Sequence, residues 1–385
     1  MKILNICVNG VYTDGYTYHE NLLPKYHKRI GHDVYVMASE YEFDKKGNIR
    51  KADKREYIDE NGINVKRLRI IGDRPITDRF KRFEGFSLVI SELKPDIIFC
   101  HLFQFLDVKK VIAYKKKRPN IRLYFDSHAD KINSAHGILS TYILHGMVWK
   151  YFAKKAYQAA NAFYGVSPAR VDFLRSMYGL PADKTKLLVM GADDDMVRWS
   201  ENFEIQIQTR MAYEIDEDDF LIVTGGRLDK SKVHVLNLMR VIQKNFPKIK
   251  LIVFGPVSDD MLNDVKKLAV DNIKYVGWID EKEAYRLFSI CKIAVFPCTH
   301  SVYWEQVAGQ GKPMIIRYWS GFEHLNLGGN VRYLLNSSEE EIRMSIAEIL
   351  NENHYVEMKK VAIQKGQKVF SYYAIAKESI EENDK

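Results

Sequence analysis

The chain has 385 residues, of which 46% are hydrophobic and 28% charged, and it carries a formal net charge of +8. This length predicts two domains rather than one core, and no apolar run approaches the roughly 20 residues that span a bilayer. Its start is not typical of a signal peptide, and its four cysteines lack CxxC spacing. We therefore expect a cytoplasmic protein with buried thiols and neither disulfides nor zinc.

Strand-like and helix-like segments alternate through the first half of the chain. A strand is expected at 3–8, then a turn-rich loop at 9–15. The helix that follows ends near Gly31, and Pro24 either kinks it or stands in its first turn. Residues 40–62 predict a charged, exposed excursion. Further strands are expected at 33–37, 96–101, 123–126 and 162–166, with helices at 137–160 and after the Ser167-Pro168 cap.

The same alternation restarts in the second half. Together the two series predict parallel sheets with crossover helices, arranged as two Rossmann-like domains. A hinge is expected at 190–195, which separates an N-terminal domain at 1–193 from a second domain at 194–355. The expected strands are 220–224, 250–254, 273–276 and 292–296, and the expected helices are 232–244, 259–269 and 281–290.

The excess of positive charge lies in residues 1–195, with basic clusters at 79–86 and 115–118. Clustered Lys and Arg beside aromatic residues suit an anionic membrane surface or an acidic acceptor. Solvated helix ends and loops are the simpler interpretation. No nucleic-acid-binding motif accompanies the charge, so we expect no nucleic-acid partner.

Residues 221–232 run Leu-Ile-Val-Thr-Gly-Gly-Arg-Leu-Asp-Lys-Ser-Lys, so an apolar strand ends at two glycines. Glycine lets a backbone approach a ligand closely, and the start of a helix favours an anion. Arg227 and Lys232 would add two cations, which is typical of a diphosphate clamp. The alternative is a surface loop with solvated cations.

A second feature begins where an apolar strand ends at Pro297. A polar loop then leads into a short helix carrying Glu305, and Gly-Lys-Pro at 311–313 stops that helix. Open α/β sheets bind ligands at this place, behind the carboxyl end of a parallel strand. An isolated glutamate here could instead serve only the helix dipole.

These segments, in this order, resemble the GT-B glycosyltransferases of family 4. Gly-Gly-Arg-Leu at 225–228 with Lys232, and Glu-Gln-Val-Ala-Gly-Gln-Gly-Lys-Pro at 305–313, are similar to the patterns of that family. The resemblance covers nearly the whole chain and implies a GT-B fold, with two Rossmann-like domains facing an inter-domain cleft. It also implies that helices at 356–385 cross back to the first domain. Further segments match in family order at 31–34, 165–168, 188–193, 254–256 and 276–279.

The resemblance also implies roles for individual residues. Arg227 and Lys232 would hold the donor diphosphate, and Glu305 would accept hydrogen bonds from the ribose. In the first domain, Gly15 would lie beside the donor phosphate and acceptor, and the strand-end residue His128 near the transferring sugar carbon. His101 is a second strand-end candidate. The implied donor-binding residues are Gly226, Arg227, Lys232, Pro256, Trp278, Ile279, Ser301 and Glu305.

The chain departs from the family pattern at one position. Relatives commonly carry another glutamate eight residues before the ribose-binding one, where it contacts the donor sugar, but this chain has Pro297 there. The nearest polar candidates to replace that glutamate are His300, which would then belong to the catalytic site, and Ser301. The alternative leaves His300 merely exposed on the loop. The identity of the sugar therefore does not transfer from relatives.

The combined hypothesis is a retaining, metal-independent, hexosyl-type glycosyltransferase. It would move a sugar from a nucleotide-diphosphate donor, above all a UDP-sugar, to a surface polysaccharide or glycolipid acceptor. Two cations at the diphosphate would make a metal unnecessary, so we expect no metal site and no cofactor besides the donor, and interpret 193–195 as solvated charge. Alternatives are a degenerate GT-B carbohydrate- or partner-binding protein without catalysis, and a nucleotide-sugar epimerase. The expected location is cytoplasmic, peripheral on the inner face of the membrane.

Overall fold

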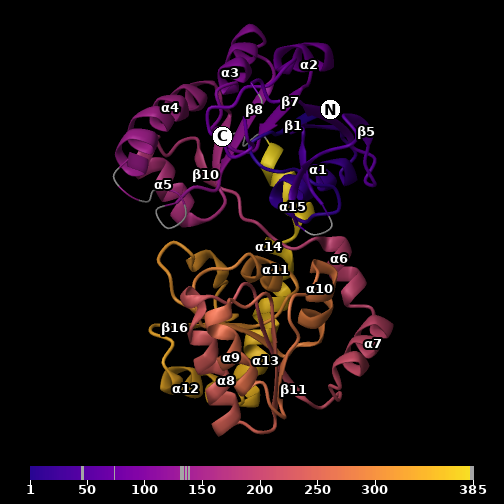
Figure 1. The fold of residues 1–385 in the computed structure, drawn as a ribbon, viewed down its shortest axis with the longest axis vertical. Coiled ribbons are helices and arrows are strands. Elements are labelled where there is room, and N and C mark those ends of the chain that lie inside the picture. The colour runs from indigo at the N-terminus through magenta and orange to yellow at the C-terminus, as the bar shows by residue number, and fades with distance from the viewer. Residues whose placement is uncertain (45–46, 73, 131–133, 135–136, 138, 382–385) are drawn as a thin grey trace. The chain divides into compact units, whose positions relative to one another are not determined.

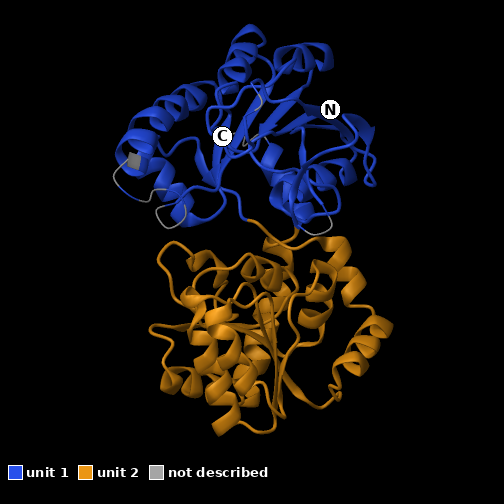
Figure 2. Cartoon of the chain, viewed as in Figure 1, with its two compact units in different colours: residues 1–189, 372–385 blue, residues 190–371 orange. Residues whose placement is uncertain are grey.

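The computed structural model describes residues 1–44, 47–72, 74–130, 134, 137 and 139–381. The chain divides into two compact units (Figure 2). Unit 1 contains Met1–Val189 and Tyr372–Lys385, and unit 2 contains Met190–Ser371. This division differs from the expected one at both borders, because the junction falls before Met190 and the return to unit 1 begins at Tyr372 instead of residue 356.

Unit 1 is built on an eight-stranded sheet with the order β10-β9-β8-β7-β1-β2-β6-β5, parallel except for β5 against β6. Its central strands are buried and consist mainly of apolar residues, as expected when helices cover both faces of a parallel sheet. A separate hairpin pairs β3 (Tyr41–Phe43) with β4 (Ile49–Lys51) in the predicted excursion. The sheet strands are β1 (Lys2–Cys7), β2 (Asp33–Ser39), β5 (Glu56–Ile58), β6 (Asn64–Leu68), β7 (Ile97–Cys100), β8 (Arg122–Ser127), β9 (Ala162–Gly165) and β10 (Thr185–Leu187).

The first helix shows how unit 1 accommodates an awkward residue. Helix α1 begins at His19 and continues through Pro24 to Arg29, so the alternative start near Pro24 is wrong. Pro24 has no N–H to donate to the carbonyl of Glu20. The buried thiol of Cys7 lies 3.7 Å from that carbonyl oxygen and donates to it instead. The other helices are α2 (Phe86–Leu93), α3 (Val108–Lys117), the π-helix η1 (Leu139–Trp149), α4 (Lys150–Ala159), α5 (Pro168–Tyr178) and α15 (Tyr372–Ile380).

Helix α15, from the far end of the chain, packs beside α1 (Figure 1). His27 Nε2 lies 2.9 Å from the Ser379 hydroxyl, and both groups are buried. Arg122 and Tyr164 donate to the carbonyls of Ile380 and Ser379, at 2.8 and 3.3 Å. The last helix therefore completes the core of unit 1.

Unit 2 contains a six-stranded, fully parallel sheet with the order β13-β12-β11-β14-β15-β16. The two Rossmann-like α/β domains expected from the sequence are confirmed. The strands are β11 (Phe220–Gly225), β12 (Ile249–Phe254), β13 (Ile273–Tyr275), β14 (Ile293–Phe296), β15 (Met314–Arg317) and β16 (Val331–Leu334). The helices are α6 (Asp194–Ser200), α7 (Phe203–Tyr213), η2 (Lys230–Lys232), α8 (His234–Asn245), α9 (Asp259–Leu268), α10 (Glu281–Ile290), α11 (Tyr303–Gly309), η3 (Glu323–Leu325), α12 (Glu339–Ile349), α13 (Glu352–Val361), η4 (Ala362–Gly366) and α14 (Gln367–Val369).

Several local predictions need correction. Ser167 precedes α5 in an extended conformation, but its side chain makes no capping hydrogen bond. Asp193 is buried and caps α6 by accepting from the backbone N–H of Asp195, so it is not solvated charge. In the basic clusters, Lys81 is buried and donates to two backbone carbonyls, and Lys115 donates to two more. Among the described residues, no helix combines the length and apolar character needed to cross a membrane.

Candidate functional site

The loops that leave β11, β12 and β13 lie together at the carboxyl edge of the unit 2 sheet. Backbone hydrogen bonds join them: Gly255 donates to the carbonyl of Gly277 at 2.7 Å, and Leu228 donates to that of Pro256 at 2.9 Å. Pro256 and Trp278 are exposed on these loops, and Ile279 is half-buried. Three of the segments predicted to bind the donor are therefore assembled in one place.

Two glycines let these loops approach closely. Gly255 has a φ of +117°, and a Cβ there would lie 2.1 Å from the carbonyl oxygen of Gly226. Gly226 has a φ of +118°, and a Cβ on it would lie 3.5 Å from the Ser301 hydroxyl. The loop after β14, which carries Ser301, thus reaches the loop after β11. These backbone conformations favour glycine for steric reasons.

The two predicted cations differ in their surroundings. The ammonium of Lys232 donates to the carbonyl of Thr299, which ties η2 to the loop after β14. Burial lowers the pKa of Lys232, although Cys298 and Asp229 oppose that shift. The Arg227 side chain is 78% exposed, with its Nε 3.7 Å from a carboxylate oxygen of Asp229. Lys232 is therefore positioned by the fold, whereas Arg227 extends from the same loop toward solvent.

Glu305 lies on α11, is fully buried and is held by two histidines. His300 Nε2 lies 2.9 and 3.0 Å from its two carboxylate oxygens, and His324 Nε2 lies 3.5 Å from one of them. The His300 ring stacks on Phe322, with ring centroids 4.3 Å apart. Burial alone would raise the pKa of Glu305, but His300 and His324 lower it well below its usual range. The structure therefore joins His300 and Glu305, to which the sequence assigned separate roles.

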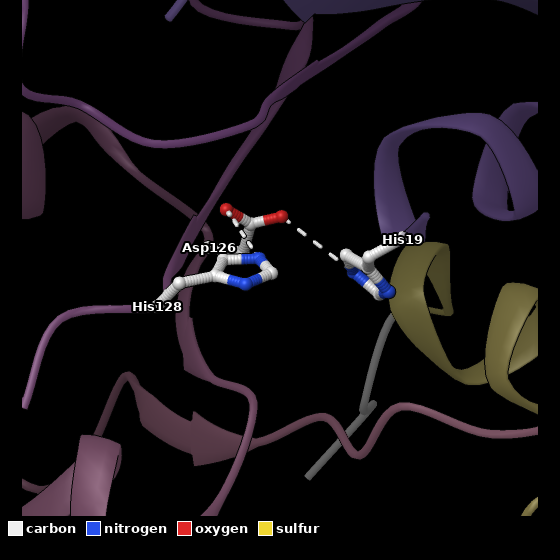
Figure 3. A group of neighbouring side chains, drawn as sticks. All are labelled: His19, Asp126 and His128. Carbon is white, nitrogen blue, oxygen red and sulfur yellow. Dashed lines mark ion pairs between the residues drawn. The ribbon is translucent and has the colours of Figure 1, made fainter. Parts of the chain in front are cut away.

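The candidate residues of unit 1 gather around one carboxylate that sequence reasoning had not singled out. Asp126, on β8, lies 2.8 Å from His101 Nδ1. It also lies 3.5 Å from His19 Nε2 and 3.8 Å from His128 Nε2 (Figure 3). Cys100 and Phe125 pair in register, so the next residues on the two strands, His101 and Asp126, are neighbours. Gly15 precedes His19 by four residues and lies on an exposed turn after β1, with a φ of +77°.

His19 and Asp126 are the residues of this cluster that the sequence did not predict as functional. Both are buried, and His19 is the first residue of α1. A signal was available for Asp126, because a carboxylate ending an apolar strand two residues before a histidine is unusual for a structural position. For His19 the surrounding sequence carries no comparable signal.

Two Rossmann-like units, one of them with glycine-containing loops and two cations at the carboxyl edge of its sheet, define a two-domain α/β protein of the doubly wound class. Residues 17–195 match the family model described as Glycosyltransferase Family 4, and residues 205–369 match that described as Glycosyl transferases group 1. The chain therefore belongs to the GT-B glycosyltransferases, with one domain of each description. The resemblance seen in the sequence is confirmed.

Similar proteins agree with this fold. The uncharacterized glycosyltransferase MJ1607 of Methanocaldococcus jannaschii is 21% identical over 286 residues, which are 71% of this chain and 68% of that protein. Sucrose-phosphate synthase from Thermosynechococcus elongatus is 16% identical with a TM-score of 0.67, covering 98% of this chain and 96% of that one. Anabaena Alr3699/HepE in complex with UDP is 14% identical with a TM-score of 0.65, covering 98% of each chain.

Proposed function

We propose that this glycosyltransferase transfers a hexosyl-type sugar from a nucleotide-diphosphate donor, a UDP-sugar, with retention of configuration. The acceptor we propose is a surface polysaccharide or a glycolipid. The observation that carries the proposal is the convergence of Gly226, Lys232 and Ser301 at one edge of the unit 2 sheet. Such an edge suits a diphosphate, because backbone N–H groups and cations neutralise it together. UDP in the Anabaena structure supports the choice of nucleotide.

In this proposal the residues of unit 2 bind the donor. Arg227 and Lys232 neutralise the diphosphate without a divalent metal at that position, and Glu305 accepts hydrogen bonds from the ribose hydroxyls. Trp278, Ile279 and Pro256 border the base. His300 and Ser301 border the sugar, where relatives carry a glutamate.

Unit 1 would present the acceptor, with Gly15 and His128 near the transferring carbon. Retention would follow a front-face route in which the leaving phosphate takes the proton of the acceptor hydroxyl. The acceptor oxygen then forms the new bond to the sugar carbon while the bond to the phosphate oxygen breaks. This route needs no protein nucleophile.

Thermal unfolding with a panel of nucleotides and nucleotide sugars tests donor binding. A ligand at 100 times its Kd stabilises the folded state by about 2.7 kcal/mol, so a true donor raises the Tm measurably. We expect UDP and one UDP-sugar to do so. If no nucleotide shifts the Tm, a degenerate binding protein without catalysis is the better hypothesis. The presence of Pro297 at the position of the sugar-contacting glutamate favours that hypothesis. Sugar products formed without any acceptor would identify an epimerase instead.

We also propose that unit 1 associates peripherally with anionic membranes. Support comes from the exposed side chains of Tyr142, Met147 and Tyr151 on η1 and α4. Helix α4 also carries the exposed Lys154 and Lys155, and the Lys155 ammonium lies 5.9 Å from the centroid of the Tyr151 ring. Aromatic and basic residues on one helical segment suit a lipid interface. Co-sedimentation with vesicles tests this association. We expect the protein to bind anionic vesicles, and we expect the double substitution Tyr142→Ser/Met147→Ser to weaken that binding. Equal binding to neutral and anionic vesicles would contradict it.

A further inference from the structure

The carboxylate of Asp126 is fully buried, and among the residues that the structure describes, those within ion-pair distance of it include the imidazoles of His19, His101 and His128. A buried anion is costly unless a cation and hydrogen bonds compensate it. The cluster thus has a negative charge at its centre and nitrogen atoms around it.

Both oxygens of this carboxylate are fixed by neighbouring donors. His101 Nδ1 contacts Oδ2 at 2.8 Å, and the backbone N–H of Leu102 donates to Oδ1 at 2.9 Å. The same two oxygens also face the other histidines, Oδ2 toward His19 and Oδ1 toward His128. Outer hydrogen bonds that hold a carboxylate in place while it faces imidazole nitrogens are the usual second shell of a metal ligand.

His19 has a buried nitrogen without a hydrogen-bond partner among the described residues. Its Nδ1 lies 3.1 Å from the Tyr372 hydroxyl, whereas its Nε2, 3.5 Å from Asp126 Oδ2, makes no hydrogen bond within this described part of the chain. A neutral imidazole carries one N–H, on either ring nitrogen. If Nδ1 donates to Tyr372, the lone pair of Nε2 faces a carboxylate oxygen, an arrangement that a cation between them would stabilise.

We propose that His19 Nε2, Asp126 and His128 Nε2 bind a divalent transition metal ion such as Zn²⁺, with His101 and Tyr372 as positioning residues. One donor atom from each of the three residues lies within 4.8 Å of the other two (Figure 3). Ligand atoms bound at about 2.0–2.1 Å around a tetrahedral metal lie about 3.3–3.4 Å apart, close to the His19–Asp126 separation. Two imidazoles with one carboxylate form a set typical of such metals.

Three protein ligands leave one position of a tetrahedral metal for an oxygen ligand such as water. The His128 side chain is 30% exposed, whereas those of His19 and Asp126 are fully buried, so solvent reaches the cluster from the His128 side. The site shares His128 with the proposed transfer reaction, whereas the cations proposed for the diphosphate belong to unit 2. Metal binding needs neither donor nor acceptor, so this inference goes beyond the proposed transfer reaction and does not depend on it.

Cobalt titration of the full-length, untagged protein after dialysis against EDTA tests the site. We expect one equivalent of Co²⁺ to give visible d–d absorption, Zn²⁺ to abolish that absorption, and both metals to raise the Tm. His128→Ala, on the partly exposed ligand, should weaken Co²⁺ binding at least about 10-fold. Tyr372→Phe should weaken Co²⁺ binding to a smaller extent and leave the d–d absorption spectrum of the bound metal unchanged.

His145 provides a matched control, because it is also buried in unit 1 with Nδ1 2.7 Å from a tyrosine hydroxyl, that of Tyr178. His145→Gln should leave Co²⁺ affinity unchanged, whereas His19→Gln should reduce it. If His19→Gln fails to fold, His128→Ala decides. Absence of stoichiometric Co²⁺ binding, or binding that His128→Ala leaves unchanged, would overturn the proposal. The experiment contains no nucleotide, so failure of donor binding leaves its result intact.

Discussion

Nε2 of His300 lies within hydrogen-bond distance of both carboxylate oxygens of Glu305, at 2.9 and 3.0 Å. A ribose that binds this carboxylate must share it with His300 or displace the imidazole. The sugar end and the ribose end of the proposed donor site are therefore coupled through one contact. Changes at His300 should consequently affect nucleotide affinity as well as sugar specificity.

Glu305→Gln tests that coupling, because it keeps the shape of the side chain but removes its charge. Hydrogen bonds to charged groups contribute about 1.5–3 kcal/mol, so we expect UDP affinity to fall about 10-fold or more. Isothermal titration calorimetry measures the loss. Glu339→Gln, at an exposed ion pair with Arg240, is the control and should bind UDP normally. Unchanged UDP affinity in Glu305→Gln would exclude Glu305 from the nucleotide site.

Arg227→Ala should separate diphosphate binding from base binding. The side chain is 78% exposed, so its removal should leave the Tm nearly unchanged. We expect UDP affinity to fall about 10-fold, as one charge-assisted contact is lost, whereas the weaker binding of uridine should not change. The neighbouring Lys230, 88% exposed, provides the control variant Lys230→Ala. Equal losses for UDP and uridine would argue against a diphosphate contact.

Gly255→Ala should disrupt the junction of the donor loops. Its Cβ would lie 2.1 Å from the Gly226 carbonyl oxygen, so one loop must move. Gly277→Ala is matched to it, since Gly277 also has a positive φ, of +75°, but no atom lies within 4 Å of its added Cβ. We expect a lower Tm and loss of UDP binding for Gly255→Ala, and only the backbone cost of about 1 kcal/mol for Gly277→Ala. Comparable Tm values in the two variants would contradict the close approach.

The stability of the protein should decrease between pH 6.5 and pH 4 because of buried histidines. Burial lowers the pKa of His27 to about 3, whereas an unfolded histidine titrates near 6.5. Below about pH 6.5 the unfolded state therefore binds a proton that the folded state does not, and stability falls by up to about 1.4 kcal/mol per pH unit for this group. The contribution of His27 to the free energy of unfolding is therefore fully present above pH 6.5 and is lost as the pH approaches 3.

His27→Gln should flatten the dependence of the Tm on pH in this window. His19, also buried with a lowered pKa, contributes in the same window, so the slope should decrease without vanishing. His354→Gln, at a largely exposed side chain, should leave the curve unchanged. A His27→Gln curve parallel to that of the wild type would show that His27 does not titrate as expected.

Periodicity and turn residues predicted the two α/β series correctly, because each buried strand needs a continuous apolar run and each covering helix an apolar face. Those patterns do not determine the order of the strands in each sheet. Only the pairing of β7 with β8 makes His101 and Asp126 neighbours, and only the packing of α1 adds His19. The contact between His300 and Glu305 likewise depends on the path of a short loop, which residue spacing does not determine. Lys81 appeared to belong to an exposed basic cluster because charge alone does not reveal a buried ammonium bound to carbonyls.

Helix α15 makes the folding of unit 1 depend on residues 372–380, which are synthesised after unit 2. Unit 1 contains both ends of the sequence, so His27 and Tyr164 cannot reach their α15 partners until residue 380 has left the ribosome. Unit 2, encoded between the two parts, is complete before unit 1 is. Domains generally fold as they emerge during synthesis. Unit 1 is an exception, because it cannot complete its fold until α15 has been synthesised. Translation that stops before residue 372 would release a first domain lacking the helix that covers His19 and His27.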